Sequence, residues 1–216
     1  MAAAATRTLK VATGVCLVVQ RDPIQTAKLV ASIDQVSGGR FLFGIGNGWN
    51  QDEIENHGTE FKTRHKLARE CVEAMEVIWT QEKAEYHGEF VNFDPMIARP
   101  KPVQKPHPPI IVGGAFPYSA RRAIRYGDGW IPHATRSSYA EIADMIPQFQ
   151  KMAREAGRDP KTIETTVWGP KQDAELMKRY QDLGVSRVVF NLESDNADTI
   201  LPLIDGWAKL MRQVNG

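Results

Sequence analysis

The chain has 216 residues, a length that suits one α/β domain of the barrel type, for which about 250 residues is usual. Lys and Arg number 27 against 26 Asp and Glu, so the formal net charge is +1. That balance supplies no broad positive field for nucleic acid or an anionic membrane surface.

The N-terminal run MAAAATRTLK lacks the apolar stretch of a secretory signal, and the longest clean apolar run, residues 15–19, is far too short to span a bilayer. Cys16 lies in that apolar run and Cys71 on the apolar face of a helix, which is typical of small buried hydrophobes and not of a disulfide pair. We therefore expect a cytoplasmic protein that binds neither nucleic acid nor a membrane.

Short β-rich runs alternate with helical patterns from one end of the chain to the other, which is the signature of a parallel α/β sheet. We count six βα units and predict a single domain over residues 1–216. The predicted strands span residues 9–19, 41–45, 109–112, 129–133, 163–168 and 187–192.

Three helices carry clear apolar stripes at helical spacing. In the first, Glu70, Glu73 and Glu76 fall on the side opposite the stripe. The second begins at a capping box formed by Ser138 and Glu141, and the last has Asp195 or Asn196 as its N-cap and is expected to close the domain. The three stripes are Leu67, Cys71, Met75 and Ile78; Tyr139, Ile142, Ile146, Phe149 and Met152; and Ile200, Leu203, Ile204, Trp207 and Leu210.

Residues 85–109 interrupt this alternation, because their prolines forbid a central strand or helix. We interpret the segment as a surface insertion. Its first half predicts a small hairpin that turns at His87-Gly88, and its second half predicts a stiff extended connector.

In parallel α/β folds the ligand site lies beyond the carboxyl ends of the strands. The turn Gly113-Gly114-Ala115-Phe116 follows one predicted strand and precedes a helix with Arg121 and Arg122, so it could bind a phosphate. The alternative is a tight turn whose arginines face solvent.

A second strand end, Gly46-Asn47-Gly48-Trp49, does not fit the dinucleotide fingerprint. Its glycines could admit a flat ring, with Asn47 offering hydrogen bonds and Trp49 forming a wall; alternatively, Trp49 covers the rim of the fold. A third feature, Gly14-Val15, interrupts the first strand and marks either a close ligand approach or relief of crowding.

The histidines show no metal-ligand spacing, so we predict no metal. Only His133 follows a predicted strand, where it could contact a substrate or simply form part of a polar rim. No nucleophile with a partner base can be assembled at the strand ends, and the catalytic residues stay unassigned.

The runs SGGRFLFGIGNGWN, EYHGEF through RPKPVQKPHPPIIVGG, and RYGDGW together resemble the luciferase-like monooxygenase superfamily, in particular its coenzyme F420-dependent oxidoreductases. The resemblance implies a TIM-barrel-like (β/α)₈ fold of the bacterial luciferase type, incomplete here with six units. It also implies FMN or F420 as cofactor, with the phosphate at Gly113, Gly114, Ala115 and Phe116.

The resemblance further implies a non-prolyl cis peptide at Gly14-Val15 that supports the ring, and a ring lining from Gly46, Asn47, Gly48 and Trp49. It places the start of this chain at the family's third strand. The acidic or histidine residue that usually ends the second strand therefore has no counterpart, and Trp49 stands where sugar-phosphate dehydrogenases of the family have a carboxylate.

Two missing strands would leave unpaired sheet edges. Either the start was misassigned or the chain closes by homo-oligomerising. We expect an oxidoreductase or monooxygenase that transfers hydride or activates oxygen through the cofactor and acts on a small molecule. A non-catalytic cofactor-binding or scaffold protein is the alternative, and a barrel enzyme for phosphorylated sugars is weaker, because no carboxylate pair lies at the strand ends.

Overall fold

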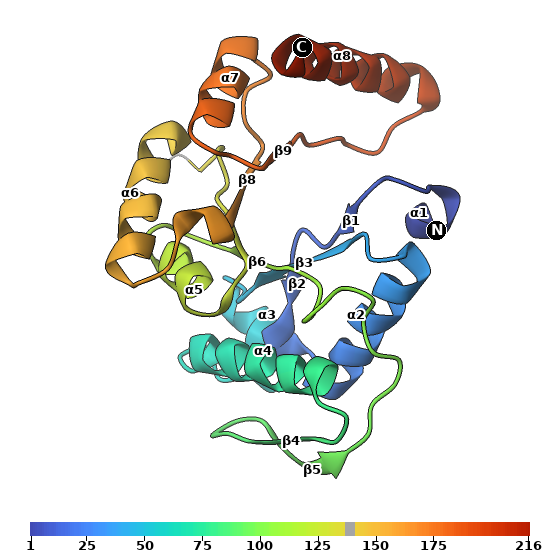
Figure 1. Cartoon of the computed structure of the whole chain (residues 1–216), viewed down its shortest axis with the longest axis vertical. Coiled ribbons are helices and arrows are strands. Elements are labelled where there is room, and N and C mark those ends of the chain that lie inside the picture. The colour runs from blue at the N-terminus through green and yellow to red at the C-terminus, as the bar shows by residue number, and fades with distance from the viewer. Residues whose placement is uncertain (137–140) are drawn as a thin grey trace. The chain divides into compact units, whose positions relative to one another are not determined.

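The chain is described here from a computed structural model that covers residues 1–136 and 141–216. The residues divide into two compact units (Figure 1). Unit 1 comprises Met1–Gly113 with Arg125–Asp128, and unit 2 comprises Gly114–Ile124 with Gly129–Gly216. Within the described residues, no helix is both long and apolar enough to cross a membrane.

The sheet of unit 1 is built on one central strand, β3, which spans Phe41–Gly46 and is buried along its whole length. It pairs in parallel with three others, which are β1 (Val11–Ala12), β2 (Cys16–Leu17) and β6 (Ile110–Gly113). Such burial on both faces is what an uninterrupted apolar run predicts for a parallel strand.

The first predicted strand is wrong as one continuous element. Residues 9–19 instead form β1, a break at residues 13–15, β2, and a 3₁₀ turn, η1 (Val18–Gln20). Within the break, the Thr13 hydroxyl donates to the Gly44 carbonyl at 2.8 Å, and the Gly14–Val15 peptide is cis.

The second helix of unit 1 has a side-chain cap at its start and a glycine at its end. Asp22 caps the second helix by accepting from the Gln25 N–H at 2.7 Å, and Gly38 ends it with φ of 64°. The helices are α1 (Ala2–Ala5), α2 (Pro23–Ser37), α3 (Gln51–Asn56) and α4 (Arg64–Thr80). As predicted, α4 buries Cys71, Met75 and Ile78.

The segment predicted to be an insertion contains the expected hairpin, made of β4 (Ala84–His87) and β5 (Asn92–Met96). The proline-rich connector after it is tied to α2, because buried Asp34 accepts from the backbone N–H of Gln104 at 2.9 Å and from its side chain at 2.7 Å.

One feature of the predicted polar side of α4 is wrong. Glu70 is only 4% exposed, and its carboxylate accepts the backbone N–H groups of Glu89, Phe90 and Val91. The hairpin turn therefore covers this part of the helix, which a count of helical spacing could not reveal.

Unit 2 is a three-stranded parallel sheet with its own core. The strands are β7 (Gly129–Ile131), β8 (Glu164–Trp168) and β9 (Arg187–Val189), with β8 in the middle. The helices are α5 (Tyr118–Tyr126), α6 (Ile142–Glu155), the 3₁₀ turn η2 (Pro160–Thr162), α7 (Ala174–Asp182) and α8 (Ala197–Asn215). Trp130 packs on Phe149 at 4.8 Å between ring centroids.

The two capping predictions in unit 2 have different outcomes. Asn196 is the N-cap of α8, and its side chain accepts from the Thr199 N–H at 3.1 Å. The N-cap of α6 is Glu141, without a side-chain hydrogen bond, whereas the predicted Ser138 and Tyr139 lie outside the described residues.

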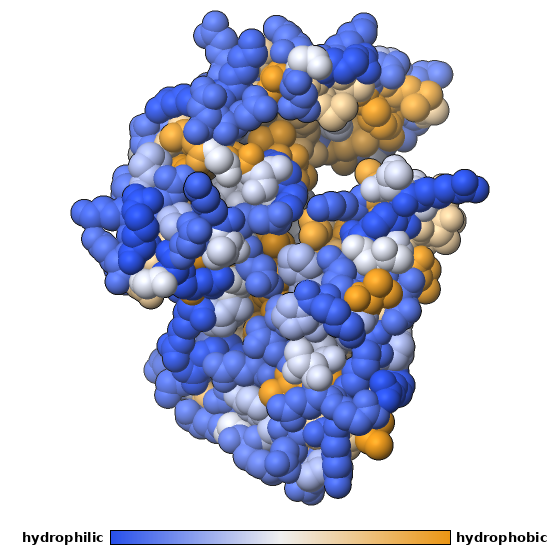
Figure 2. All heavy atoms as spheres, viewed as in Figure 1, coloured by the Kyte–Doolittle hydropathy of each residue, from blue (hydrophilic) through white to orange (hydrophobic). Residues whose placement is uncertain are grey.

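The apolar stripe of α8 is not part of a closed core. None of the residues of α8, all of which the structure describes, is buried. Leu203 and Ile204 of the stripe are 45% and 42% exposed, and hydrophobic atoms gather along this helix in Figure 2. The expectation that α8 closes the domain is therefore not met within unit 2.

Candidate functional site at the strand ends

The glycine-rich segments of unit 1 lie beside one another. In the parallel register Cys16 pairs with Ile45 and Leu17 with Gly46, while Ile45 also pairs with Val112. Asn47, which follows β3, and Gly113, the last residue of β6, therefore lie at the same edge of this sheet. This edge is where a ligand site is expected in parallel α/β folds.

The structure shows why β3 carries glycine at positions 44 and 46, where a larger side chain would collide with its neighbours. A Cβ on Gly44 would lie 1.9 Å from the Thr13 carbonyl oxygen, and one on Gly46 would lie 2.6 Å from Val15 Cγ2. These glycines make room for the neighbouring segment of the chain, and the assignment of Gly46 to a cofactor site stays a prediction.

Val15, whose side chain lies against Gly46, is partly exposed. The Gly14–Val15 peptide is cis, as the resemblance implied, and the Val15 side chain is 39% exposed. Val15 thus covers Gly46 and offers an apolar surface beside the end of β3.

Asn47 is the most informative polar residue at this edge. Its side chain is 5% exposed, and its Nδ2 lies 2.9 Å from Nδ1 of His65, at the beginning of α4. Its Oδ1 is buried and has no hydrogen-bond partner among the residues that the structure describes. His65 was missed by sequence reasoning, because nothing in a separation of 18 residues signals this contact.

The loop after Asn47 turns away into α3. Gly48 has φ of 71°, and its missing Cβ leaves room for Ile54, whose Cδ1 would be 2.6 Å away. Trp49 is 83% exposed, and Asn50 caps α3. The sequence-based assignment of Gly48 and Trp49 to a cofactor site stays a prediction.

The turn predicted to bind phosphate continues into unit 2. There the Ser119 hydroxyl donates to the Gly114 carbonyl at 2.8 Å and accepts from Trp130 Nε1 at 2.9 Å. Gly114 has φ of 128°, and a Cβ on it would lie 3.1 Å from Nη2 of Arg122. The turn is therefore braced from within the core, and Arg122 lies beside it.

His133 follows β7, as predicted. It forms a bridge with Trp168 of β8, and its Nδ1 lies 2.9 Å from the Thr135 hydroxyl. Burial, followed by the positive charge of Arg136, lowers the pKa of His133 below its ordinary value. A neutral imidazole at the strand end suits hydrogen bonding to an uncharged substrate group.

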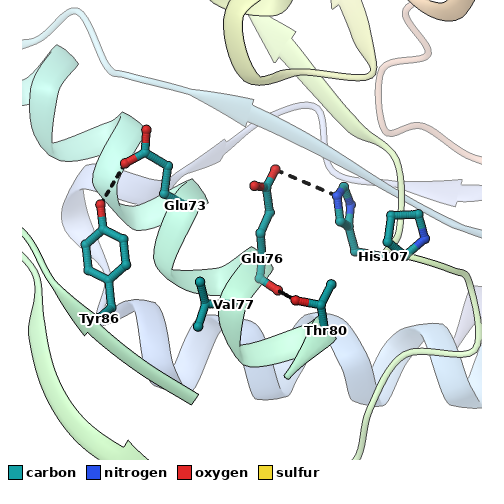
Figure 3. A pocket seen from close by; sticks show the side chains of 7 residues that line it. Glu73, Glu76, Val77, Thr80, Tyr86 and His107 are labelled. Atoms are coloured by element: carbon teal, nitrogen blue, oxygen red, sulfur yellow. Dashed lines mark hydrogen bonds and ion pairs between the residues drawn. The ribbon is translucent and has the colours of Figure 1, made fainter. Parts of the chain in front are cut away.

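A hollow of about 520 Å³ lies beside α4, between this helix, the hairpin and the proline-rich connector (Figure 3). Figure 3 shows Tyr86 directed at Glu73 and His107 directed at Glu76, and the Tyr86 hydroxyl donates to Glu73 Oε2 at 2.7 Å. Nε2 of His107 lies 3.7 Å from Glu76 Oε1. These polar groups contact one another across the hollow. We therefore interpret their role as structural: they join α4 to the hairpin and the connector. Among the described residues, no group of three His, Cys, Asp or Glu is placed to hold a metal ion.

The parallel α/β units, with polar and glycine-rich residues at the strand ends, define a protein of the TIM-barrel-like class. A family model described as luciferase-like monooxygenase matches residues 1–187. An uncharacterized protein of Mycobacterium tuberculosis is 41% identical over 214 residues, which make up 96% of this chain and 72% of that protein. The chain belongs to the luciferase-like monooxygenase family.

Two relatives with described activities match shorter parts. An F420-dependent hydroxymycolic acid dehydrogenase of Mycobacterium tuberculosis is 31% identical over 70% of this chain and 41% of its own length. An FMNH(2)-dependent dimethylsulfone monooxygenase of Pseudomonas putida is 36% identical over 49% of this chain and 30% of its own length.

Solved structures confirm the predicted fold. An F420-dependent secondary alcohol dehydrogenase matches with a TM-score of 0.79 at 18% identity, over 100% of this chain and 82% of that protein. A monooxygenase from Streptomyces bottropensis matches with a TM-score of 0.68 at 24% identity, over 98% and 64%. These residues therefore form an incomplete TIM-barrel-like fold.

Proposed function

We propose that this chain binds FMN or coenzyme F420 and serves as an oxidoreductase or monooxygenase for a small-molecule substrate. The observation that carries the proposal is the buried Oδ1 of Asn47, which has no hydrogen-bond partner among the described residues, at the end of the strand whose last residue, Gly46, is covered by the partly exposed Val15. A planar heterocycle with a hydrogen-bond donor on one edge satisfies both features. The family membership supports it, because the relatives include one protein dependent on F420 and one dependent on FMNH(2).

The residues of the chain have separate parts in this proposal. Val15 would support the ring, and Asn47 would hold its polar edge. Considered by itself, the turn Gly114–Phe116 of unit 2 would bind a phosphate group through backbone N–H groups at the start of α5, with Arg122 adding positive charge. The bound cofactor supplies hydride transfer or oxygen activation, and the protein supplies binding and orientation.

Fluorescence titration tests this proposal. Purified protein is titrated with FMN and with F420, and with riboflavin as a ligand without phosphate. We expect saturable binding of FMN or F420, weakened at least tenfold by Asn47→Leu and left unchanged by Asn92→Leu, a matched exchange at an exposed position of β5. Absence of binding to both cofactors overturns the proposal.

The proposal that the chain is catalytic is separate from cofactor binding. Turnover of the oxidised cofactor with a panel of alcohols, or of the reduced cofactor with aldehydes, ketones or oxygen, supports the enzyme. Tight binding with no turnover in that panel favours the alternative, a non-catalytic cofactor-binding or scaffold protein.

We also propose that the chain forms a homo-oligomer in the cytoplasm. The exposed apolar residues of α8 support the oligomer, because uncovered side chains of this size favour association. The free thiols Cys16 and Cys71 support a reducing compartment. Burial raises the pKa of the Cys71 thiol to about 12, so this residue is an inert part of the core.

A further inference from the structure

Asn47 and His65 form a pair in which each side chain fixes the other. The distance between Asn47 Nδ2 and His65 Nδ1 is 2.9 Å. The amide NH₂ group can only donate, so in this arrangement Nδ1 of the imidazole accepts and the ring proton lies on Nε2. The direction of the Asn47 amide and the tautomer of His65 are therefore coupled: an amide with its NH₂ group toward His65 requires the imidazole that carries its proton on Nε2.

The opposite end of the amide is left as an acceptor. Oδ1 of Asn47 is buried and has no hydrogen-bond partner within the described part of the chain, and the side chain as a whole is 5% exposed. A buried carbonyl oxygen without a partner is destabilising, because it has lost its hydrogen bonds to water. Without His65, the amide could exchange its two ends and present a donor instead, because its oxygen and nitrogen are nearly equal in shape.

We infer that His65 is a positioning residue that holds Asn47 as a hydrogen-bond acceptor, and that the site therefore selects planar ligands with an N–H group on their edge. This inference rests on the proposed function and deepens it. The isoalloxazine of FMN and the deazaflavin of F420 both carry such a group, an imide N–H flanked by two carbonyls. A methyl group on this nitrogen removes the donor and leaves the ring otherwise intact.

The consequence is a selectivity that a purely structural contact would not produce. A site that hydrogen-bonds one group of its ligand discriminates strongly against an analogue without that group, since its own buried polar atom is then left unpaired. For Asn47 we expect a preference of about tenfold to a hundredfold for the parent ligand, which is the range that one lost hydrogen bond of about 1.4–2.8 kcal/mol produces.

The experiment measures the ratio of dissociation constants for N3-methyl FMN and FMN by fluorescence titration, with F420 and its N3-methyl derivative in parallel. The native protein should have a ratio of about ten or more. His65→Phe removes the acceptor at an exposed position and should bring the ratio close to one. His65→Gln, whose side-chain oxygen can accept from Asn47 Nδ2, should restore most of it.

Two controls separate the possible results. His57→Phe exchanges another exposed histidine, at the end of α3, and should leave the ratio at the native value. Urea unfolding of each variant shows whether a changed ratio of dissociation constants reflects lost stability. The ratio for the native protein is free of this problem, because it is measured without any substitution.

Each outcome decides something different. Binding of FMN or F420 with a native ratio near one overturns the inference and leaves the proposed function standing. A high native ratio that survives in His65→Phe shows that Asn47 needs no positioning, and overturns the role of His65. Absence of binding to either parent ligand overturns the proposed function and this inference together.

Discussion

The indole N–H of Trp130 donates to the hydroxyl of Ser119 at 2.9 Å, and both side chains are completely buried. The same hydroxyl donates to the carbonyl of Gly114 at 2.8 Å. The core of unit 2 thus holds the turn that we propose to bind phosphate. A site on such a turn depends on residues that do not touch the ligand.

Replacement of Ser119 by alanine tests this coupling. Ser119→Ala leaves the buried Trp130 N–H and the Gly114 carbonyl without their partner, so we expect a loss of about 1–3 kcal/mol in the free energy of unfolding. Trp130→Phe removes the donor instead. Urea unfolding of both single variants and of the double variant should give non-additive losses, with the double variant less unstable than the sum. Additive losses would contradict the coupling.

Much of the fold could be predicted because burial leaves a direct trace in the sequence. The residues of β3 are apolar on both faces, and they form a fully buried parallel strand. Spacing also located α4 with its core residues Cys71, Met75 and Ile78. Local patterns of this kind require no knowledge of which segments meet in space.

Features that depend on distant segments could not be predicted in this way. Glu70 has the same helical spacing as solvent-exposed glutamates, and only the hairpin reveals that its carboxylate is buried. The Asn47–His65 pair joins a strand end to a helix start. The strand break at residues 13–15 depends on the close approach of Thr13 to Gly44. In each case the partner is identified by the fold and not by local sequence.

Glu70 gives a prediction with a defined pH dependence. Burial alone raises the pKa of Glu70, but the three backbone N–H groups of Phe90, Val91 and Glu89 and the charge of Arg69 lower it, and the net shift is downward. The folded-state pKa therefore lies below the unfolded value of about 4.3. The carboxylate stabilises the native state above about pH 4.3, and this stability is lost as the pH falls through the folded-state pKa.

Replacement by glutamine removes the charge while it keeps the size of the side chain. For Glu70→Gln we expect a loss of about 1.5–3 kcal/mol at pH 7, the usual value for hydrogen bonds to a charged group. Urea unfolding between pH 7 and pH 3 should show the difference between the native protein and the variant shrinking below about pH 4.3. Glu85→Gln, at an exposed position of β4, is the matched control. If the difference in unfolding free energy between the native protein and Glu70→Gln stays constant with pH, the carboxylate that binds the hairpin turn is not charged.

The glycines of β3 should differ in their tolerance of a methyl group. In Gly46→Ala the new Cβ meets the end of the Val15 side chain at 2.6 Å, so we expect a loss of about 1–3 kcal/mol from overpacking. In Gly44→Ala it meets the Thr13 carbonyl oxygen at 1.9 Å. Backbone cannot move aside as a side chain can, and the loss should exceed about 4 kcal/mol.

A second exchange identifies the cause of the smaller loss. Val15→Ala removes the Cγ2 atom that the new methyl group would meet, so the double variant with Gly46→Ala should recover part of the stability measured by urea unfolding. The same Val15→Ala exchange combined with Gly44→Ala should bring no recovery, since the obstruction there is the backbone of Thr13. Equal recovery in both backgrounds would show that the loss has another origin.

The exposed face of α8 yields a prediction about association. Leu201 and Ile204 are 57% and 42% exposed, so a glutamate at either position should change the free energy of unfolding of the monomer by no more than about 0.5 kcal/mol. If this face covers itself by pairing with a second copy, Leu201→Glu and Ile204→Glu should shift sedimentation velocity profiles toward the monomer. Leu29→Glu, at a 64% exposed position of α2, should leave them unchanged. A native protein that sediments as a monomer at every concentration would exclude the proposed oligomer, because a buried apolar interface must appear as mass-action association.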